Sequence, residues 1–240
     1  MTTKNDINSL MAKAEEKFQV DFESVKIGDS NLQILQIQNL DEYLERLVDK
    51  SSTTDPLELP FWAKIWPASI LLSYSLTALK DIKTTEETSI LELGAGIGLC
   101  GLYAASLGFR TTITDNNKDA LLFARINALK NGLEDKVEVC YVDMAESIMN
   151  TRFDYILGSE ILYIENLNRS LVKFICGHLK PEGRAILSAD YKRQSRKFFK
   201  LAEREFKISQ KTIGYKEKTP ENRQEKFLCN IYNLQPKNND

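Results

Sequence analysis

The feature that most limits the possible folds is a glycine-rich loop between an apolar segment and an amphipathic one. Residues 88–93 (TSILEL) lead into the run GAGIGLCG, in which Gly94, Gly96 and Gly98 occupy alternate positions. Glycine permits the positive φ angles of a sharp turn and a close approach of the backbone to a ligand. The free amides at the start of a following helix favour an anion. The sequence therefore predicts a ligand-binding loop between a buried strand and a helix.

Strand-like and helix-like segments alternate at short intervals around this loop. Further strands are expected over residues 110–115, 136–143, 153–160 and 184–190, and helices over residues 67–81, 98–108, 116–132, 166–183 and 193–206. Two more strands, 207–218 and 225–234, are expected to form an antiparallel C-terminal hairpin. Such alternation is typical of a mostly parallel sheet with helices on both faces. The predicted fold class is a doubly wound α/β domain.

The chain before this domain has a different character. We expect residues 1–55 to form an extension: an irregular or weakly helical arm, a hairpin around Gly28, and a helix over residues 39–49. Residues 50–56 (KSSTTDP) are expected to be a loop. The main domain is then expected to span residues 56–236, with a polar tail at 237–240.

Composition excludes several classes of site and partner. The 240 residues carry a formal net charge of −2, which gives no general reason to expect nucleic acid. A single histidine, His178, excludes a multi-histidine metal site and is expected to cap a helix or lie on the surface. The four cysteines form no C-x-x-C pair and are expected to be buried thiols. No segment resembles a signal peptide or a membrane span, so a soluble, cytoplasmic protein is expected.

The glycine loop alone fits two kinds of cofactor. Residues 96–101 match the dinucleotide pattern G-x-G-x-x-G, which is a weak signal by itself. Three features favour another interpretation: Glu92 interrupts the apolar strand, Asp143 ends the third strand, and a long segment precedes the first strand. A nicotinamide-dependent oxidoreductase stays open as an alternative, although no set of residues for hydride transfer is visible.

The pattern E-x-G-x-G-x-G from Glu92, followed by acidic residues after the next two strands, resembles the S-adenosylmethionine-dependent methyltransferases with a seven-stranded Rossmann-like sheet. The C-terminal hairpin resembles the reversed last strand of that family. The resemblance implies that the loop passes under the methionine part of the cofactor, that Asp115 binds the ribose hydroxyls, and that Asp143 binds the adenine amino group. The cofactor-binding residues it implies are Trp66, Glu92, Gly94, Ala95, Gly96, Gly98, Asp115, Asn116, Asp143 and Ser159.

Two further stretches resemble a subgroup, the protein lysine methyltransferases related to those that modify the electron-transfer flavoprotein β-subunit, translation factors and chaperones. These are LPFWAKIWPAS, which holds both tryptophans, and SEILY after the fourth strand. The resemblance implies that Trp66 borders the methyl-transfer site and that Glu160 and Tyr163 are catalytic. It implies a protein substrate that presents a lysine. Trp62 fits either the pocket wall or the core.

Other activities remain open on the same fold. The [DNS]-P-P-[YF] segment of many base-amino methyltransferases is absent, which makes a nucleic-acid substrate unlikely. N-methylation of a small amine or of RNA is nevertheless an alternative, and so is a catalytically silent methyltransferase-like binding module. The complete set of acidic and glycine positions argues against the silent module.

Overall fold

The computed structural model describes residues 4–50, 59–79, 87–163, 165–193, 195–218 and 224–237. Helices of this part are α1 (Lys4–Glu15), α2 (Leu40–Lys50), α3 (Pro67–Ser75), α4 (Leu99–Ser106), α5 (Lys118–Lys130), α6 (Asn168–His178) and α7 (Arg196–Ala202). Its strands are β1 (Val20–Ile27), β2 (Ser30–Ile37), β3 (Ser89–Leu93), β4 (Arg110–Asp115), β5 (Val137–Tyr141), β6 (Phe153–Ser159), β7 (Leu179–Asp190), β8 (Phe206–Lys218) and β9 (Gln224–Pro236). The expected loop at 51–56, the boundary after residue 55 and tail residues 238–240 lie outside the described residues.

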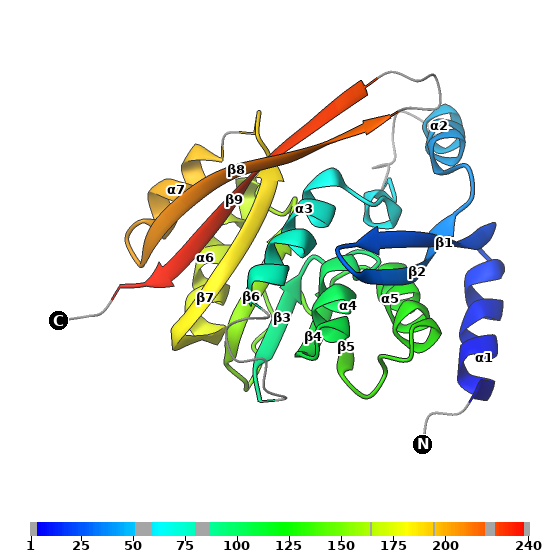
Figure 1. Ribbon diagram of the computed structural model, residues 1–240, viewed down its shortest axis with the longest axis horizontal. Helices are drawn as coiled ribbons and strands as arrows, with labels where there is room; N and C mark the ends of the chain where they lie inside the picture. The colour runs from blue at the N-terminus through cyan, green and yellow to red at the C-terminus, as the bar shows by residue number, and fades with distance from the viewer. Residues whose placement is uncertain are drawn as a thin grey trace.

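A seven-stranded sheet in the order β5-β4-β3-β6-β7-β9-β8 forms the centre of the molecule (Figure 1). The five strands from β5 to β7 run parallel, and β9 is antiparallel to both β7 and β8. This confirms the predicted doubly wound α/β fold and the antiparallel C-terminal hairpin. The strand order reverses between β3 and β6, and in such sheets ligands bind outside the carboxyl ends of the strands at this switch point.

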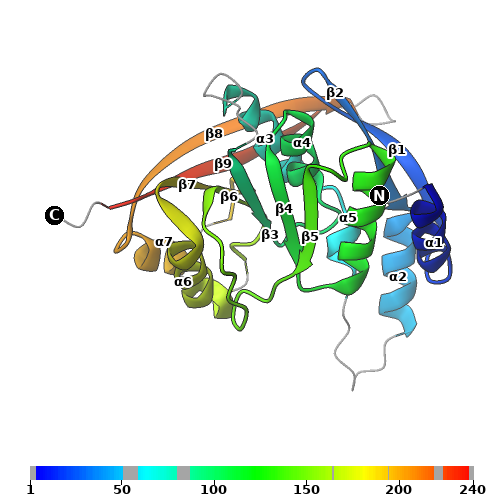
Figure 2. The same ribbon diagram turned by 90° about the horizontal axis from the view of Figure 1, so that it is seen from below.

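Helices cover both faces of the sheet. Helices α3, α4 and α5 pack on one face, and the β1–β2 hairpin lies over α4 and α5, whereas α6 and α7 pack together on the other face (Figure 2). The predicted hairpin around Gly28 forms, with Ile27 opposite Ser30 at its turn.

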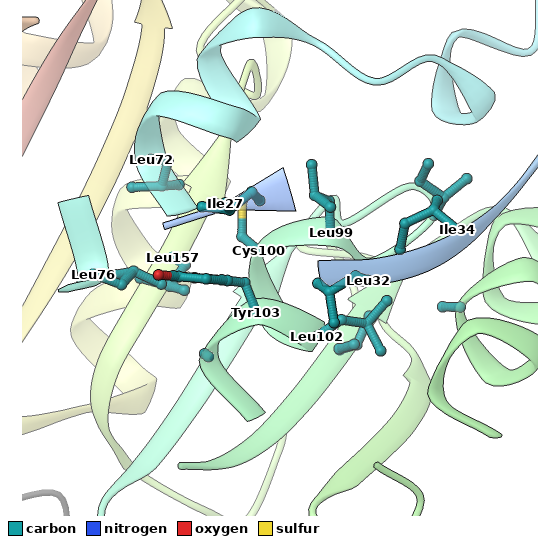
Figure 3. Packing of buried hydrophobic residues seen from close by; sticks show 14 of the residues in the cluster. Ile27, Leu32, Ile34, Leu72, Leu76, Leu99, Cys100, Leu102, Tyr103 and Leu157 are labelled. Carbon is teal, nitrogen blue, oxygen red and sulfur yellow. The ribbon is translucent and has the colours of Figure 1, made fainter. Parts of the chain in front are cut away.

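The hairpin completes the core of the first face. Ile27 and Ile34 of the hairpin pack with Leu72 of α3 and with Leu99 and Tyr103 of α4 (Figure 3), and all five side chains are buried. Each fully buried aliphatic side chain of this kind contributes about 1.5–3 kcal/mol to the free energy of unfolding. The N-terminal extension therefore shares one apolar core with the sheet domain, and the division of the chain into an extension and a domain stays a prediction.

Three elements differ from the sequence-based expectation. The arm expected to be irregular or weakly helical contains the regular helix α1, because Ile7, Leu10 and Met11 lie on one side of it and pack against the core. Helix α6 ends at His178 rather than at residue 183, and the chain enters β7 directly, with Leu179 opposite Phe153. Helix α7 is shorter than expected and ends at Ala202.

The end of α6 has a clear physical cause. The bulge in the β6–β7 pairing is held by Asp154, whose carboxylate accepts a hydrogen bond from the Lys180 ammonium at 2.8 Å. A side chain at Gly183 would come within 2.9 Å of the Asp154 carbonyl oxygen, so only glycine fits there. These contacts bring residues 180–183 into the sheet.

All four cysteines are free thiols, and Cys100 and Cys229 are buried whereas Cys140 and Cys176 are half-buried. Within the part of the chain that the structure describes, no helix is both long and apolar enough to cross a membrane.

Candidate active site

The glycine loop lies at the carboxyl end of β3, at the switch point of the sheet. Gly94 and Gly96 have φ angles of 57° and 54°, which a residue with a side chain rarely adopts. A Cβ atom at Gly96 would come within 2.4 Å of the Trp62 carbonyl oxygen, and one at Gly94 within 2.7 Å of the Ile161 side chain. The loop is therefore a tight backbone passage between the FWA segment (Phe61–Ala63) and the residues after β6.

Hydrogen bonds from β4 hold this loop in place. The Ala95 amide donates to the Thr114 carbonyl at 3.0 Å, and the Gly96 amide donates to Asp115 Oδ2 at 2.8 Å. Asp115 Oδ1 accepts a hydrogen bond from the Asn117 amide at 2.9 Å, while Asn117 itself caps α5. Burial raises the pKa of Asp115, and the amides oppose that rise. Each carboxylate oxygen still has a lone pair for a hydroxyl group, so this position fits the predicted ribose contact.

Glu92 lies beneath the loop rather than at its surface. Its side chain is fully buried, and Oε2 accepts a hydrogen bond from the Gly101 amide at 2.7 Å, in the first turn of α4. Burial raises its pKa to about 7 against the lowering effect of the Gly101 amide. A Cβ atom at Gly101 would come within 2.7 Å of this oxygen, which explains the fourth glycine of the run, at position 101. Glu92 thus supports the helix start from below.

The other predicted cofactor residues lie along the same carboxyl edge. Asn116 is exposed directly after β4, and the carbonyl of Asp115 accepts a hydrogen bond from Val142 at 3.1 Å, which brings Asp143 close to Asp115 along the neighbouring strand. Asp143 is half-buried and its Oδ1 accepts from the Ala145 amide at 2.8 Å. Ser159 ends β6, and its Oγ lies 3.1 Å from Ser188 Oγ on β7. The structure therefore gathers these side chains at one edge.

Glu160 is held on the other side of the switch point in an unusual backbone conformation. It has a φ of 53°, and its amide donates to the Ser188 carbonyl at 2.9 Å. Its Oε1 accepts a hydrogen bond from the Asp190 amide at 2.7 Å. Its Oε2 is buried and accepts no hydrogen bond from the described residues. Burial raises the pKa of Glu160, although the Asp190 amide and the charge of Arg193 lower it.

Arg193 contacts both residues predicted to be catalytic, Glu160 and Tyr163. Its Nε lies 3.3 Å from Glu160 Oε2, and its guanidinium carbon lies 5.4 Å from the centre of the Tyr163 ring. Tyr163 is 51% exposed, so this ring forms part of the outer wall of the site. Sequence reasoning missed Arg193, because it belongs to a basic run whose spacing gives no sign of an inward contact.

The two tryptophans have different surroundings. The Trp62 ring packs against Phe18 and Phe123 with centroid separations of 5.8 and 5.0 Å, so its side chain belongs to the core. Only its carbonyl oxygen borders the glycine loop. Trp66 is half-buried at the start of α3, donates its indole N–H to the Phe61 carbonyl at 3.1 Å, and has the Lys64 ammonium 5.6 Å from its ring.

Two other residues have roles that the sequence did not reveal. Asn127 is fully buried, accepts a hydrogen bond from the Leu35 amide of β2 at 2.7 Å, and donates to the Ile97 carbonyl of the glycine loop at 3.0 Å. His178 is not a surface residue, but it ends α6 and bonds a carbonyl oxygen one turn earlier, as expected of a capping histidine. The imidazole is buried, with Nδ1 against the Phe174 carbonyl and Nε2 accepting from the Met149 amide at 2.9 Å.

The donor set fits a nucleoside-containing organic cofactor better than a metal ion. The glycine loop lies so close to neighbouring groups that only glycine fits at Gly94 and Gly96, and the buried Asp115 carboxylate faces the loop from β4. No group of three metal-ligating side chains occurs among the described residues. The site therefore combines a preformed cofactor passage with an acidic side chain that has one oxygen free of hydrogen bonds.

The family model described as lysine methyltransferase matches residues 60–205 of this chain. Protein N-lysine methyltransferase METTL21A of Mus musculus is 35% identical over 156 residues, which cover 61% of this chain and 69% of that protein. The Xenopus tropicalis METTL21A is 33% identical, with 56% and 62% covered. The chain thus spans roughly two thirds of these relatives. A Histidine protein methyltransferase 1 homolog of Dictyostelium discoideum is 28% identical over 60% of this chain and 48% of that protein.

Solved structures share the fold at low sequence identity. The Thermus thermophilus 16S rRNA N2 G1207 methyltransferase RsmC, in complex with AdoMet and guanosine, superposes with a TM-score of 0.63 at 16% identity, covering 91% of this chain and 51% of that one. A putative RNA methyltransferase of Pyrococcus horikoshii gives 0.57 at 19% identity, covering 85% and 100%. At these identities the likeness concerns the fold alone.

Proposed function

The chain belongs to the lysine methyltransferase family, and from that premise we propose that it transfers a methyl group from S-adenosylmethionine to a lysine side chain of a partner protein. The predictions of a methyltransferase and of its cofactor are confirmed by the family match and by the METTL21A relatives. The observation that carries the substrate proposal is the buried Glu160 Oε2, a carboxylate oxygen without a hydrogen-bond donor beside the cofactor passage. We place this activity in the cytoplasm.

The residues at the carboxyl edge have separate roles in holding the cofactor. Backbone groups of Gly94, Ala95 and Gly96 line the methionine portion, Asp115 accepts hydrogen bonds from the ribose hydroxyls, and Asp143 accepts one from the adenine amino group. The indole face of Trp66 suits a sulfonium cation, since aromatic faces attract cations. When bound, S-adenosylmethionine supplies a methyl group already activated for transfer to a nucleophile.

The acceptor side must deliver a neutral amine in line with that methyl group. A lysine ammonium with a pKa of about 10.4 must lose its proton, which costs about 4–5 kcal/mol near neutral pH. Partial desolvation of the amine on entering the site lowers the lysine pKa and reduces this cost, and the released proton passes to solvent. Glu160 Oε2 accepts a hydrogen bond from the amine and orients its lone pair, so the protein contributes mainly by positioning. We propose Glu160 and Tyr163 as the residues that contact the acceptor.

A transfer assay tests this function. Purified protein is incubated with a cell extract and cofactor labelled in its methyl group, and protein, nucleic acid and small molecules are then separated. We expect label on lysine in one or a few proteins and a loss of at least about 100-fold for Glu160→Ala. Glu182→Ala, an exposed acidic residue at the start of β7, is the matched control and keeps full activity.

The other outcomes would contradict parts of this function. Label only in RNA or in small molecules would overturn the protein substrate while keeping the cofactor. No label in any fraction, with cofactor binding intact by calorimetry, would favour the silent binding module. Equal labelling by the Glu160→Ala variant and the wild type would remove Glu160 from the acceptor site.

A further inference from the structure

The two oxygens of Glu160 have very different surroundings. Oε1 accepts a hydrogen bond from the Asp190 amide at 2.7 Å, which fixes the carboxylate to the end of β7. Oε2 accepts none from the described residues, although it has almost no contact with solvent. A buried polar atom without a hydrogen bond is unfavourable, and native structures rarely keep one without a function. This oxygen therefore requires a donor that the described part of the resting protein does not provide.

The Arg193 side chain is the group that contacts this oxygen. Its Nε lies 3.3 Å from Oε2, close enough for charge attraction but without hydrogen-bond geometry. The same guanidinium lies over the face of Tyr163 at 5.4 Å, and the Arg193 side chain is 42% exposed against 12% for Glu160. Arg193 thus covers a buried oxygen from the solvent side, and an acceptor amine reaches Oε2 only after the guanidinium has moved.

Other charged or titratable groups near this carboxylate come from three elements. Asp190 lies at the end of β7, where its charge raises the pKa of Glu160, and Cys229 lies on β9, where burial and then the charges of Glu160 and Asp190 raise the pKa of its thiol. Lys192, beside Arg193, lies with its ammonium 5.8 Å from the Tyr191 ring. Among these groups, the guanidinium of Arg193 is the cation paired with Glu160.

We propose that Arg193 is a placeholder in the acceptor site: its guanidinium occupies the ammonium position of the acceptor lysine and is exchanged for it on binding. This inference rests on the proposed function. Before the exchange the carboxylate faces one cation, and afterwards it faces another, so the local charge stays the same. The Arg193–Glu160 pair lacks hydrogen-bond geometry, so an incoming ammonium that donates a charge-assisted hydrogen bond to Oε2 displaces the guanidinium.

The exchange also explains the stacking on Tyr163. An aromatic face attracts either cation, so the ring holds the guanidinium in the resting state and the ammonium in the complex. The site therefore selects cationic side chains at the binding step and disfavours uncharged ones, which cannot replace the positive charge.

The first test needs no methyl transfer, so its failure is distinct from failure of the proposed function. The Nε–H signal of Arg193 is followed by NMR in arginine-labelled protein while n-butylammonium, the end of a lysine side chain, is added at constant ionic strength. We expect the signal to shift in the wild type and to stay in place in Glu160→Gln. Tetramethylammonium, a cation without an N–H donor, is expected to give a smaller shift. An unchanged Arg193 signal in the wild type would overturn the proposal.

The second test separates binding from turnover on the protein acceptor found in the transfer assay. Removing the competing cation by Arg193→Met is expected to lower KM about three- to tenfold with kcat within twofold of the wild type. It is also expected to move the acidic limb of the pH profile of kcat/KM to higher pH, because Glu160 loses its cationic neighbour.

Two variants complete the second test. Arg193→Lys keeps the charge and is expected to restore the wild-type KM and pH profile, and Arg196→Met, at an exposed arginine at the start of α7, is expected to change neither. If Arg193→Met does not fold, Arg193→Gln serves in its place. A KM that rises in the neutral variant would show that Arg193 binds the acceptor rather than occupying its position. That result would overturn the proposal.

Discussion

The cofactor side and the acceptor side of the site are built in different ways. On the cofactor side, the Glu92 and Asp115 carboxylates are buried and bonded to backbone amides of the glycine loop and the first turn of α4. On the acceptor side, Tyr163 is half exposed, and one oxygen of Glu160 has no hydrogen bond to any residue that the structure describes. The cofactor is the same in every cycle, so its side is fixed in advance, whereas the acceptor belongs to another protein and its side must admit it.

Gly96→Ala is the strongest test of a rigid cofactor side. A positive φ of 54° and a Cβ atom 2.4 Å from the Trp62 carbonyl oxygen combine backbone strain with a backbone clash. We expect a loss of about 4 kcal/mol in the free energy of unfolding and loss of cofactor binding by calorimetry. Gly132→Ala has a similar φ of 64° in open space and is the matched control, with a loss of about 1 kcal/mol. Equal losses of stability in the two variants would show that the backbone around Gly96 moves to accommodate a side chain.

Glu92 is expected to make stability depend on pH. Burial raises its folded-state pKa from 4.5 to about 7, so the folded state holds a proton that the unfolded state has released. Its contribution to the free energy of unfolding is therefore fully present below pH 4.5 and is lost as pH rises through 7. The loss is roughly 3 kcal/mol.

Urea unfolding of the wild type and of Glu92→Gln at pH 5 and pH 8 measures this effect. The glutamine keeps an oxygen for the Gly101 amide but has no proton to lose. We expect the wild type to lose more stability than the variant between these two pH values. Parallel behaviour of the two proteins would mean that the Glu92 carboxylate is ionised at no cost in the folded state.

Asn127→Ala tests whether α5 stabilises the glycine loop through the side chain of Asn127. The change leaves the Leu35 amide and the Ile97 carbonyl without their buried partner, and we expect a loss of about 2 kcal/mol. Asn131→Ala removes bonds to Gln33 at a half-buried position and is expected to cost about half as much. Thermal unfolding compares the two variants. If Asn131→Ala lost more stability than Asn127→Ala, Asn131 would be the main connection between the hairpin and α5.

Arg193→Met gives the smallest expected change in stability and completes the comparison. Its ion pair with Glu160 is partly exposed and lacks hydrogen-bond geometry, so we expect a loss below about 1 kcal/mol by urea unfolding. A loss as large as that of Asn127→Ala would show that the acceptor side is as firmly built as the cofactor side.

Sequence reasoning predicted the sheet more completely than the site. Runs of apolar or β-branched residues that end in glycine or an acidic residue identify strands such as β3 and β4 directly, because burial and turn geometry restrict which residues fit. It identified Glu160 through the SEILY stretch. It did not identify Arg193 or Asn127, because their contacts join segments far apart in the chain and neither residue belongs to a local pattern.

The errors have similar causes. The Ile7, Leu10 and Met11 spacing of α1 was present in the sequence, but polar neighbours obscured it. The early end of α6 depends on Asp154 in another strand, so no feature of the helix itself indicates it. His178 was expected to cap a helix or lie on the surface, and its burial depends on the Met149 amide, a backbone group of another segment that the sequence does not reveal.

The bond between Leu35 and Asn127 has a consequence for the order of folding. The two residues are 92 positions apart, so the hairpin, which is made before α5, obtains this partner only after α5 has been synthesised. Contacts over such separations form late because closing a long segment costs chain entropy. Since Asn127 also holds Ile97, the cofactor loop is completed in the same late step. A nascent chain is therefore expected to bind its cofactor only when the hairpin and α5 have come together.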